Sequence, residues 1–230
     1  MSRLIAALVR HGDYHQLPGA PSAHQPFALN EQGEVQARDA GAALADILQR
    51  EGWTLHPVID SSRMLRAWQT ATGIAEQLGR PDIQCFDALA ERGVGCAANL
   101  TVQQIEQVLA EDPRYPVPPP GWKADSHYRL PLQGAESLMQ AGERVAGHLR
   151  DSMAWLRDDV PPSGTLKIYV GHGAAFRHAA HHLGVLAFEQ IAKLSMYHGV
   201  PVLLESLPDG SWRQIGGQWK QRAPKEDFID

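Results

Sequence analysis

Cysteine is scarce in this sequence of 230 residues, and the two that occur, Cys85 and Cys96, do not form a Cys-x-x-Cys pair. Two cysteines are too few for a disulfide framework, so we expect free thiols in a reducing compartment. Long apolar runs are missing as well. The stretch from Leu4 to Val9 is too short to span a membrane, and no small-residue cleavage site follows it. We therefore expect a cytoplasmic protein with no membrane partner.

The sequence also lacks an excess of positive charge. The sequence has 21 lysines and arginines against 26 aspartates and glutamates, which gives a formal net charge of -5. No global basic field is then available to recruit nucleic acid, so we expect no nucleic-acid partner. A small anionic substrate is compatible with this charge, because a local arginine cluster can oppose the overall sign.

The hydrophobic content of 43% and the charged content of 20% are typical of a globular protein. We expect a single domain over residues 1–230, with an irregular, lid-like excursion at about 93–134. Within it, residues 113–134 contain six prolines and two glycines. A loop of that length in a compact domain is usually functional or disordered.

Apolar runs alternate with amphipathic, helix-like stretches along the sequence. The predicted strands cover 4–9, 57–60, 83–89 and 166–170, with a hairpin formed by 201–207 and 212–215. The predicted helices cover about 31–51, 65–78, 102–109, 137–156 and 175–183, and Trp68 is expected in the core. This order predicts an α/β fold, a three-layer sandwich with a mostly parallel central sheet flanked by helices.

Polar clusters follow three of the predicted strands: Arg10 to Gly12, Ser61 to Arg66, and Gly171 to Gly173. Ligands of such sheets bind outside the carboxyl ends of the strands. Arginine forks bind phosphate oxygens, and a neutral imidazole nitrogen can attack phosphorus when an acceptor holds its other nitrogen. We therefore expect phosphate chemistry with no metal and no cofactor, although a lone Arg-His-Gly is more often an ordinary hydrogen-bonded segment.

Five segments, in order along the chain, carry a family resemblance. They are Leu8–Asp13, Leu29–Ala37, Ser61–Ala71, Leu89–Arg92 and Val170–Gly173. Together they resemble the signature segments of the histidine phosphatase superfamily, also called the phosphoglycerate mutase-like family. The resemblance runs from residue 4 to about residue 205 and implies the phosphoglycerate mutase-like fold.

The resemblance also implies catalytic roles at five matching positions. His11 corresponds to the phosphorylated nucleophile, and Arg10 and Arg66 to the phosphate clamps. His172 corresponds to a second phosphate-contacting histidine, and Glu91 to the proton donor.

A second group of residues is expected at the substrate. Gly12 and Gly173 would let the backbone approach the phosphate closely. Arg92 and His15 are candidate substrate contacts, and His24 lies in the same loop as His15.

Two activities fit this family. Pro118–Pro120 and 198–202 resemble phosphoglycerate mutases, but Gly93 and Ala174 stand where mutases carry a histidine and an asparagine. A mutase must hold a bisphosphate intermediate with several cations, and the sequence does not match those positions. We therefore expect a phosphatase that acts on a small phosphorylated metabolite or a phosphoprotein. The alternatives are a 2,3-bisphosphoglycerate-dependent phosphoglycerate mutase and a non-catalytic member that binds phosphorylated ligands or partners. A homodimer is left open.

Three smaller features have two interpretations each. His178 and His182 are four residues apart and could bind a metal, but a solvated or partly buried histidine face is favoured. Arg63 falls on a variable position and is expected to be exposed. The charged tail with Arg222 and Lys225 could fold over the site, although a frayed terminus is the default.

Overall fold

The central sheet is mostly parallel. The computed structural model describes residues 3–21, 25–157, 161 and 163–222. In this part of the chain, seven strands form one sheet in the order β4-β3-β5-β1-β7-β8, with β2 paired to β5. They are β1 (Leu4–Arg10), β2 (Thr54–Leu55), β3 (Val58–Ser62), β4 (Asp82–Phe86), β5 (Thr165–Gly171), β7 (Val202–Ser206) and β8 (Trp212–Gly216). The pairs β1–β7 and β7–β8 are antiparallel and the other pairs are parallel.

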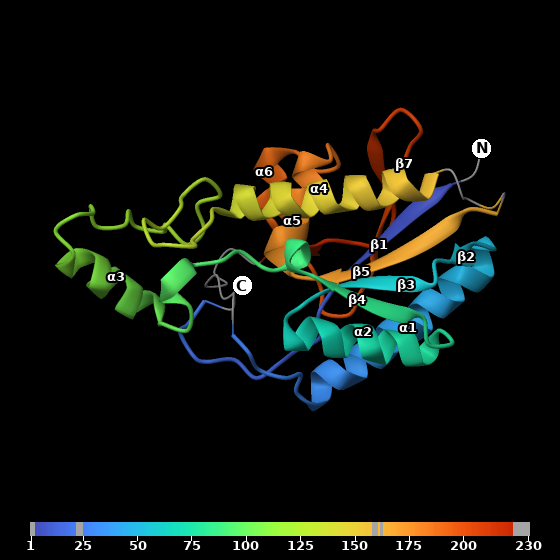
Figure 1. Cartoon of the computed structure of the whole chain (residues 1–230), viewed down its shortest axis with the longest axis horizontal. Helices are drawn as coiled ribbons and strands as arrows, with labels where there is room; N and C mark the ends of the chain where they lie inside the picture. Colours follow the sequence, from blue (N-terminus) through green and yellow to red (C-terminus); the bar gives the residue numbers. More distant parts are fainter. Residues whose placement is uncertain (1–2, 22–24, 158–160, 162, 223–230) are drawn as a thin grey trace.

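Helices cover both faces of this sheet. The helices are α1 (Glu31–Glu51), α2 (Leu65–Gln77), α3 (Val102–Glu111), α4 (Leu138–Leu156), α5 (Gly173–His182) and α6 (Phe188–Ile191). Two 3-10 turns, η1 (Asp87–Leu89) and η2 (Gly95–Ala97), and a short ribbon of β6 (Leu194–Ser195) with β9 (Lys220–Gln221) complete the described elements. Helices α4 and α5 lie on one face, and α1 and α2 lie on the other (Figure 1). The predicted three-layer α/β fold is confirmed.

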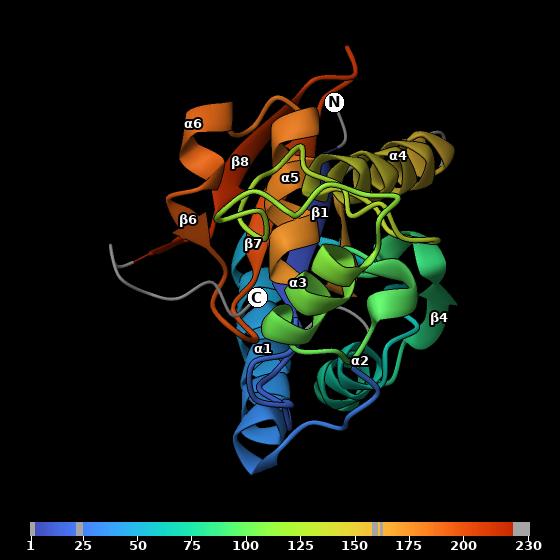
Figure 2. The ribbon, with the colours of Figure 1, turned by 90° about the vertical axis from the view of Figure 1, so that its left-hand side faces the viewer.

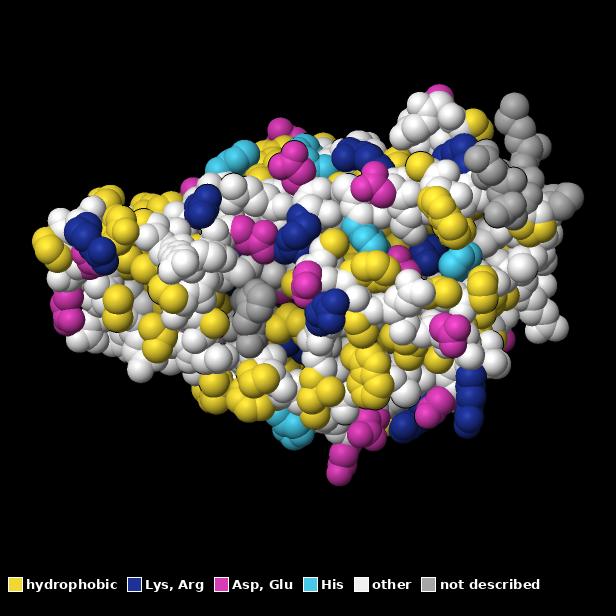
Figure 3. Space-filling model, in the orientation of Figure 1, with side chains coloured by type: hydrophobic (Ala, Val, Ile, Leu, Met, Phe, Trp, Pro, Cys, Tyr) yellow, Lys and Arg dark blue, Asp and Glu magenta, His cyan; other side chains and the backbone are white. Residues whose placement is uncertain are grey.

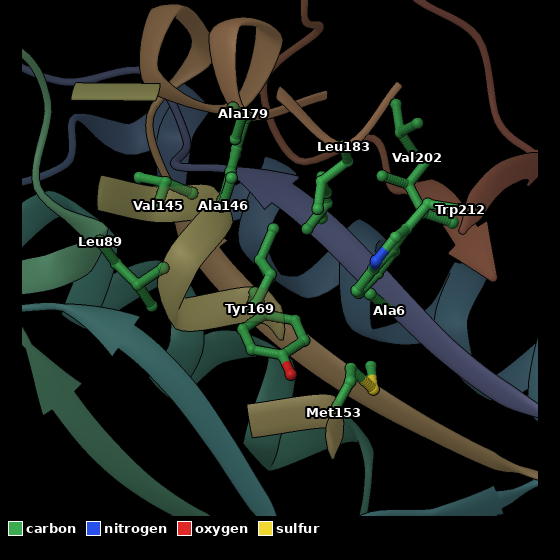
Figure 4. Close-up of a cluster of buried hydrophobic side chains, with 14 of the residues drawn as sticks. Ala6, Leu89, Val145, Ala146, Met153, Tyr169, Ala179, Leu183, Val202 and Trp212 are labelled. Carbon is green, nitrogen blue, oxygen red and sulfur yellow. The ribbon is translucent and has the colours of Figure 1, made fainter. Parts of the chain in front are cut away.

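Strand β1 runs through the middle of the sheet and is buried on both faces. Its side chains alternate: Leu4, Ala6 and Leu8 join the cluster beneath α4 and α5. The intervening residues, Ile5 among them, join the cluster against α1 and α2. Figure 4 shows the first cluster, in which Ala6 lies near Trp212. A continuous apolar run is the expected sequence of such a two-sided strand.

Two predicted elements need correction. The strand predicted for 83–89 ends at Phe86, and the chain then forms the 3-10 turn η1. Trp68 is not in the core: its side chain is exposed, with a relative accessible surface of 43%. The apolar side chains buried on α2 are those of Ala67, Ala71, Ile74 and Ala75. A Cβ added at Gly73 would crowd Ala37 on α1, so a large side chain on that face would separate the two helices.

The excursion of residues 93–134 lies beyond the carboxyl ends of the parallel strands (Figures 1 and 2). It includes η2 and α3, and residues 113–134 contain no helix or strand, as predicted. A separate apolar cluster packs it, centred on the buried side chain of Trp122. The indole N–H of Trp122 donates to Glu106 Oε1 at 3.0 Å. An irregular segment of this kind keeps a defined shape because it has its own core.

Charged side chains of both signs share the face seen in the orientation of Figure 1. Figure 3 shows acidic and basic side chains interspersed over one face of the molecule. None of the helices described here combines the length and the apolar character that crossing a membrane requires.

Candidate active site

Two histidines meet at the carboxyl ends of adjacent strands. His11 directly follows β1 and His172 directly follows β5, and these strands pair in parallel. Both side chains are buried. Their ring centroids lie 5.0 Å apart. The register Arg10↔Gly171 therefore brings together two residues that are far apart in the sequence.

The hydrogen bonds of His11 define its tautomer. Its Nδ1 lies 2.7 Å from the carbonyl oxygen of Gly12. A carbonyl oxygen can only accept, so Nδ1 carries the proton and the lone pair is on Nε2. That lone pair accepts the Nε–H of Arg66 at 3.2 Å. His11 therefore presents a neutral ring whose Nε2 faces a cation.

Burial holds the pKa of His11 well below its usual value of 6.5, and the positive charge of Arg66 adds to this effect. His172 and Arg10 contribute in the same direction. The ring is therefore unprotonated at neutral pH, as a nucleophilic imidazole must be.

Arg66 connects both histidines. It lies in the first turn of α2 and is fully buried. Besides the bond to His11, its Nη2 lies 3.3 Å from His172 Nδ1. Its Nη1 donates to the carbonyl oxygen of Gln25 at 2.9 Å. Burial lowers the pKa of Arg66, but an arginine starting from 12.5 keeps its charge.

Ser62 orients His172. The guanidinium of Arg66 can only donate, so His172 Nδ1 is the acceptor and Nε2 carries the proton. That N–H donates to Ser62 Oγ at 3.0 Å. The serine comes from the last position of β3, which explains why a polar residue is buried at a strand end.

Arg10, at the end of β1, lies against the start of α5. Its Nη1 donates to the carbonyl oxygen of Met196 at 2.9 Å. A Cβ added at Gly173 would lie 3.2 Å from Arg10 Cδ, so a side chain there would press on the guanidinium. The glycine thus makes room for Arg10.

Glu91 is held by the N-terminus of α5. Its Oε1 accepts the backbone N–H groups of Arg92 at 2.9 Å and Ala175 at 3.1 Å. Its Oε2 accepts the N–H of Ala174 at 3.2 Å. Helix N-termini stabilise negative charge, so this position suits a carboxylate.

The structure places the other residues that were predicted near the substrate in different surroundings. Gly12 and Gly33 are in backbone contact, because a Cβ added at Gly12 would overlap the carbonyl oxygen of Gly33. Arg92 is buried, and its Nη1 donates to the carbonyl oxygen of Lys123 at 3.2 Å. His15 is exposed, and its backbone N–H donates to the carbonyl oxygen of Ala28 at 3.2 Å. His24 and Lys225 lie outside the described residues.

The two histidines considered for a metal have other partners. His178 Nδ1 lies 2.7 Å from the carbonyl oxygen of Ala174, and its Nε2 lies 3.0 Å from Ser126 Oγ. His182 Nε2 lies 3.0 Å from the carbonyl oxygen of Met139. Each ring is used in a hydrogen bond between segments. His182 is partly buried, as the favoured interpretation predicted, whereas His178 is fully buried. Arg63 is exposed and pairs with Asp87 at 3.1 Å, as its variable position predicted.

Two further residues beside His11 were not predicted as site residues from the sequence. Tyr14 is buried, its ring centroid is 5.3 Å from that of His11, and Arg66 Cζ lies 4.5 Å from the ring. His198 Nδ1 lies 2.6 Å from the carbonyl oxygen of His11. Burial, with a smaller contribution from the positive charge of Arg10, lowers the pKa of His198 to about 4. The mutase-like segment 198–202 was the available signal for His198.

Comparisons with known sequences identify the family of the chain. The family model of the histidine phosphatase superfamily (branch 1) matches residues 6–213. A 2,3-bisphosphoglycerate-dependent phosphoglycerate mutase of Chelativorans sp. is 30% identical over 210 residues, which cover 89% of this chain and 93% of the relative. A mutase of the same name from Parvibaculum lavamentivorans is 26% identical over 87% of this chain and 90% of its own.

Solved structures share the fold. A mycobacterial glucosyl-3-phosphoglycerate phosphatase complexed with VO3 has a TM-score of 0.64 and 25% identity, covering 94% of this chain and 98% of the other. The alpha-ribazole phosphatase from Shigella flexneri has a TM-score of 0.69 at 17% identity, covering 92% and 95%. At 17% identity, the similarity to the alpha-ribazole phosphatase shows a shared fold and nothing more.

Proposed function

The chain belongs to the histidine phosphatase superfamily, and on that premise we propose that it hydrolyses a phosphomonoester through a phosphohistidine intermediate on His11. The observation that carries the proposal is the state of His11: buried, neutral, and with its Nε2 lone pair facing Arg66. A small phosphorylated metabolite or a phosphoprotein side chain is the substrate class.

The first half of the reaction forms the phosphohistidine. His11 Nε2 attacks phosphorus, and the bond from phosphorus to the ester oxygen breaks. Glu91 gives its proton to the departing oxygen, so the alcohol leaves uncharged. The N-terminus of α5 then stabilises the carboxylate that remains.

Cations stabilise the charge that accumulates on the phosphoryl oxygens. Arg66 must exchange its hydrogen bond to His11 for one to a phosphoryl oxygen as the new bond forms. Arg10 supplies a second guanidinium, and His172 supplies a ring N–H. Each cation is fixed in advance by bonds to other segments, which reduces reorganisation during the transfer.

The second half releases phosphate. Water attacks phosphorus, the bond to His11 Nε2 breaks, and Glu91 takes a proton from the water. The nucleophile and the acid are thereby restored. Water is favoured as the acceptor because Gly93 and Ala174 lack the side chains with which mutases hold a second phosphate.

Mutase activity is the second candidate function. The names of the curated relatives favour it, since both relatives described above are phosphoglycerate mutases. Binding without catalysis is disfavoured, because all five positions that the family uses for chemistry are filled.

One set of assays separates these activities. The purified protein is incubated with p-nitrophenyl phosphate and, separately, with 3-phosphoglycerate in the presence and absence of 2,3-bisphosphoglycerate. Hydrolysis predicts release of inorganic phosphate, with phosphate label trapped on His11 and lost in His11→Ala. Formation of 2-phosphoglycerate that requires the bisphosphate would instead establish the mutase. No turnover and no labelled His11 would refute the enzyme proposal.

A further inference from the structure

A pocket separate from the two-histidine site lies between helix α4 and the outer strands of the sheet. Its described lining consists of His56, Pro57, Val58, Asp60, Gln84, Phe86, His148, Asp151, Ser152, Trp155, Leu156 and Lys167. No residue to which the proposed reaction assigns a role belongs to this described lining. The volume of the pocket is about 500 Å³. Small-molecule sites measure about 300–1,000 Å³, so the pocket has the size of a ligand site.

Helix α4 presents two different faces to the sheet. Leu149 and Met153 belong to the apolar cluster beneath it. His148, Ser152 and Trp155 line the pocket instead, and spacings of three and four residues place them on one side of the helix. The strands that complete the pocket, β3 and β4, are the last two at one edge of the sheet. Figure 3 shows histidine, acidic and basic side chains together with hydrophobic ones in the area between α4 and β4.

The buried charges of the lining neutralise each other. Asp60 Oδ1 pairs with Lys167 Nζ at 2.7 Å, and both side chains are nearly inaccessible. The other carboxylate oxygen of Asp60 lies 2.8 Å from His148 Nε2. Burial lowers the pKa of His56, and the charge of Lys167 acts in the same direction, so this imidazole is uncharged at neutral pH. The lysine of the pocket is therefore already engaged by a carboxylate, and an anion gains little by binding there.

The exposed residues of the lining have a different character. Trp155 has a relative accessible surface of 80%, the largest among the exposed large hydrophobic residues of the described chain. Asp151, one helical turn earlier, is also exposed, and its carboxylate has no ion pair or hydrogen bond with the residues that the structure describes. Tryptophan is usually well buried, and the face of its ring attracts cations. An aromatic surface and an unpaired negative charge thus lie side by side at the entrance of the pocket.

We propose that this pocket binds a small planar aromatic cation, whose ring lies against Trp155 and Phe86 and whose positive charge lies beside Asp151. Phe86 comes from β4 and forms a ring pair with His148, with centroids 4.5 Å apart, so aromatic groups are available from the strand as well as from the helix. The acidic side chains of the described lining outnumber its lysine, which favours a cation. Apolar walls with a few converging polar groups are typical of small-molecule sites. The inference goes beyond the proposed phosphatase reaction and does not depend on it.

Three probes that share an indole ring test the proposal. At pH 7 the side chain of tryptamine ends in an ammonium group, that of indole-3-ethanol in a hydroxyl group and that of indole-3-propionate in a carboxylate. Dissociation constants are measured by NMR titration of the isotope-labelled protein. Tryptamine should bind about tenfold more tightly than indole-3-propionate, with indole-3-ethanol between them, because only the cation gains from both the carboxylate and the indole face. The amide signals that shift should include those of Gln84 and Ser152, which lie in the lining.

Two variants separate the charge from the ring. Asp151→Asn should reduce the preference for tryptamine over indole-3-propionate to about threefold or less. Trp155→Ala should weaken the binding of all three probes by about fivefold or more. Glu143→Gln, an exposed charge change on the same helix, and Trp68→Ala, the loss of an exposed tryptophan on α2, are the matched controls. Neither control residue belongs to the described lining, so both variants should bind the probes as the wild type does.

Several results would overturn the inference. These are no detectable binding of tryptamine, equal affinity for the three probes, or an undiminished preference in Asp151→Asn. Signal shifts confined to the surroundings of His11 and His172 would place the probe at the phosphate site and overturn it as well. Analytical ultracentrifugation covers the remaining occupant: a wild-type dimer that Trp155→Ala converts to a monomer would show that a second copy of the chain covers this face. Circular dichroism spectra and melting temperatures of the variants exclude misfolding as the cause of lost binding.

Discussion

The Nε–H of Arg66 donates to Nε2 of His11 at 3.2 Å, so the proposed nucleophile and the proposed clamp already form a hydrogen bond. The same guanidinium reaches His172 and the backbone of Gln25. This arrangement depends on the planar fork of arginine, because the single ammonium of lysine cannot reproduce three divergent bonds.

Arg66→Lys should therefore lower kcat/KM for p-nitrophenyl phosphate by about 100-fold or more, the usual effect of removing one preorganised donor to a developing anion. Arg63 provides the matched control, since it is exposed and lies three residues earlier. Arg63→Lys should change kcat/KM by less than about twofold. Similar losses in both variants would show that the position of Arg66 in the cluster has no special role.

Ser62 is expected to act as a positioning residue through His172. Its Oγ accepts the Nε2–H of His172 at 3.0 Å. Ser62→Ala should lower kcat by about tenfold, the size of one lost hydrogen bond of about 1.4 kcal/mol, with little change in KM. Ser62→Thr keeps the hydroxyl and should restore much of the rate. A rise in KM without a fall in kcat would argue against this role.

The motifs and the strand ends in the sequence were sufficient to predict the α/β fold and the meeting of His11, Arg66 and His172. Pairing of β1 with β5 in the register Arg10↔Gly171 places His11 beside His172. The position of Tyr14 beside His11 and Arg66 could not be predicted, because Tyr14 lies in a loop with no periodicity. The prediction for Trp68 was wrong for a different reason: helical spacing alone does not reveal that α2 packs through the face that carries Ala67, Ala71 and Ile74.

Glu91→Gln tests the proton donor. An amide cannot give a proton to the leaving oxygen, so esters with poor leaving groups should suffer most. Phenyl phosphate should lose at least about tenfold more in kcat/KM than p-nitrophenyl phosphate, whose leaving group needs little protonation. Equal losses for the two esters would remove Glu91 from the acid role and leave it as a residue that binds the N-terminus of α5.

Two glycines of different helices should respond oppositely to alanine. A Cβ at Gly33, in the first turn of α1, would overlap the carbonyl oxygen of Asp13 in the loop after His11. Gly147, inside α4, has open space at the Cβ position. Gly33→Ala should destabilise the protein by about 2 kcal/mol or more and reduce activity, because overlap with backbone forces the loop to move. Gly147→Ala should stabilise it by about 0.5–1 kcal/mol. Urea unfolding measures both, and equal signs would contradict the close approach at Gly33.

His178 makes the stability of the fold depend on pH. Burial lowers its pKa from 6.5 to about 3, so between these two values the unfolded chain binds a proton that the folded chain does not. The free energy of unfolding must then fall as the pH is lowered from 6.5, by about 1.4 kcal/mol per pH unit from this residue, until the pKa of His178 in the folded protein is reached.

The variant His178→Gln tests this dependence, because it can still bond to Ser126 and Ala174 but cannot titrate. Urea unfolding at pH 7, 6, 5 and 4 should therefore show a shallower slope for this variant. Gly147→Ala, which adds no titrating group, should shift the profile and keep its slope. Parallel profiles for wild type and His178→Gln would mean that His178 is protonated in the folded protein or already neutral in the unfolded chain.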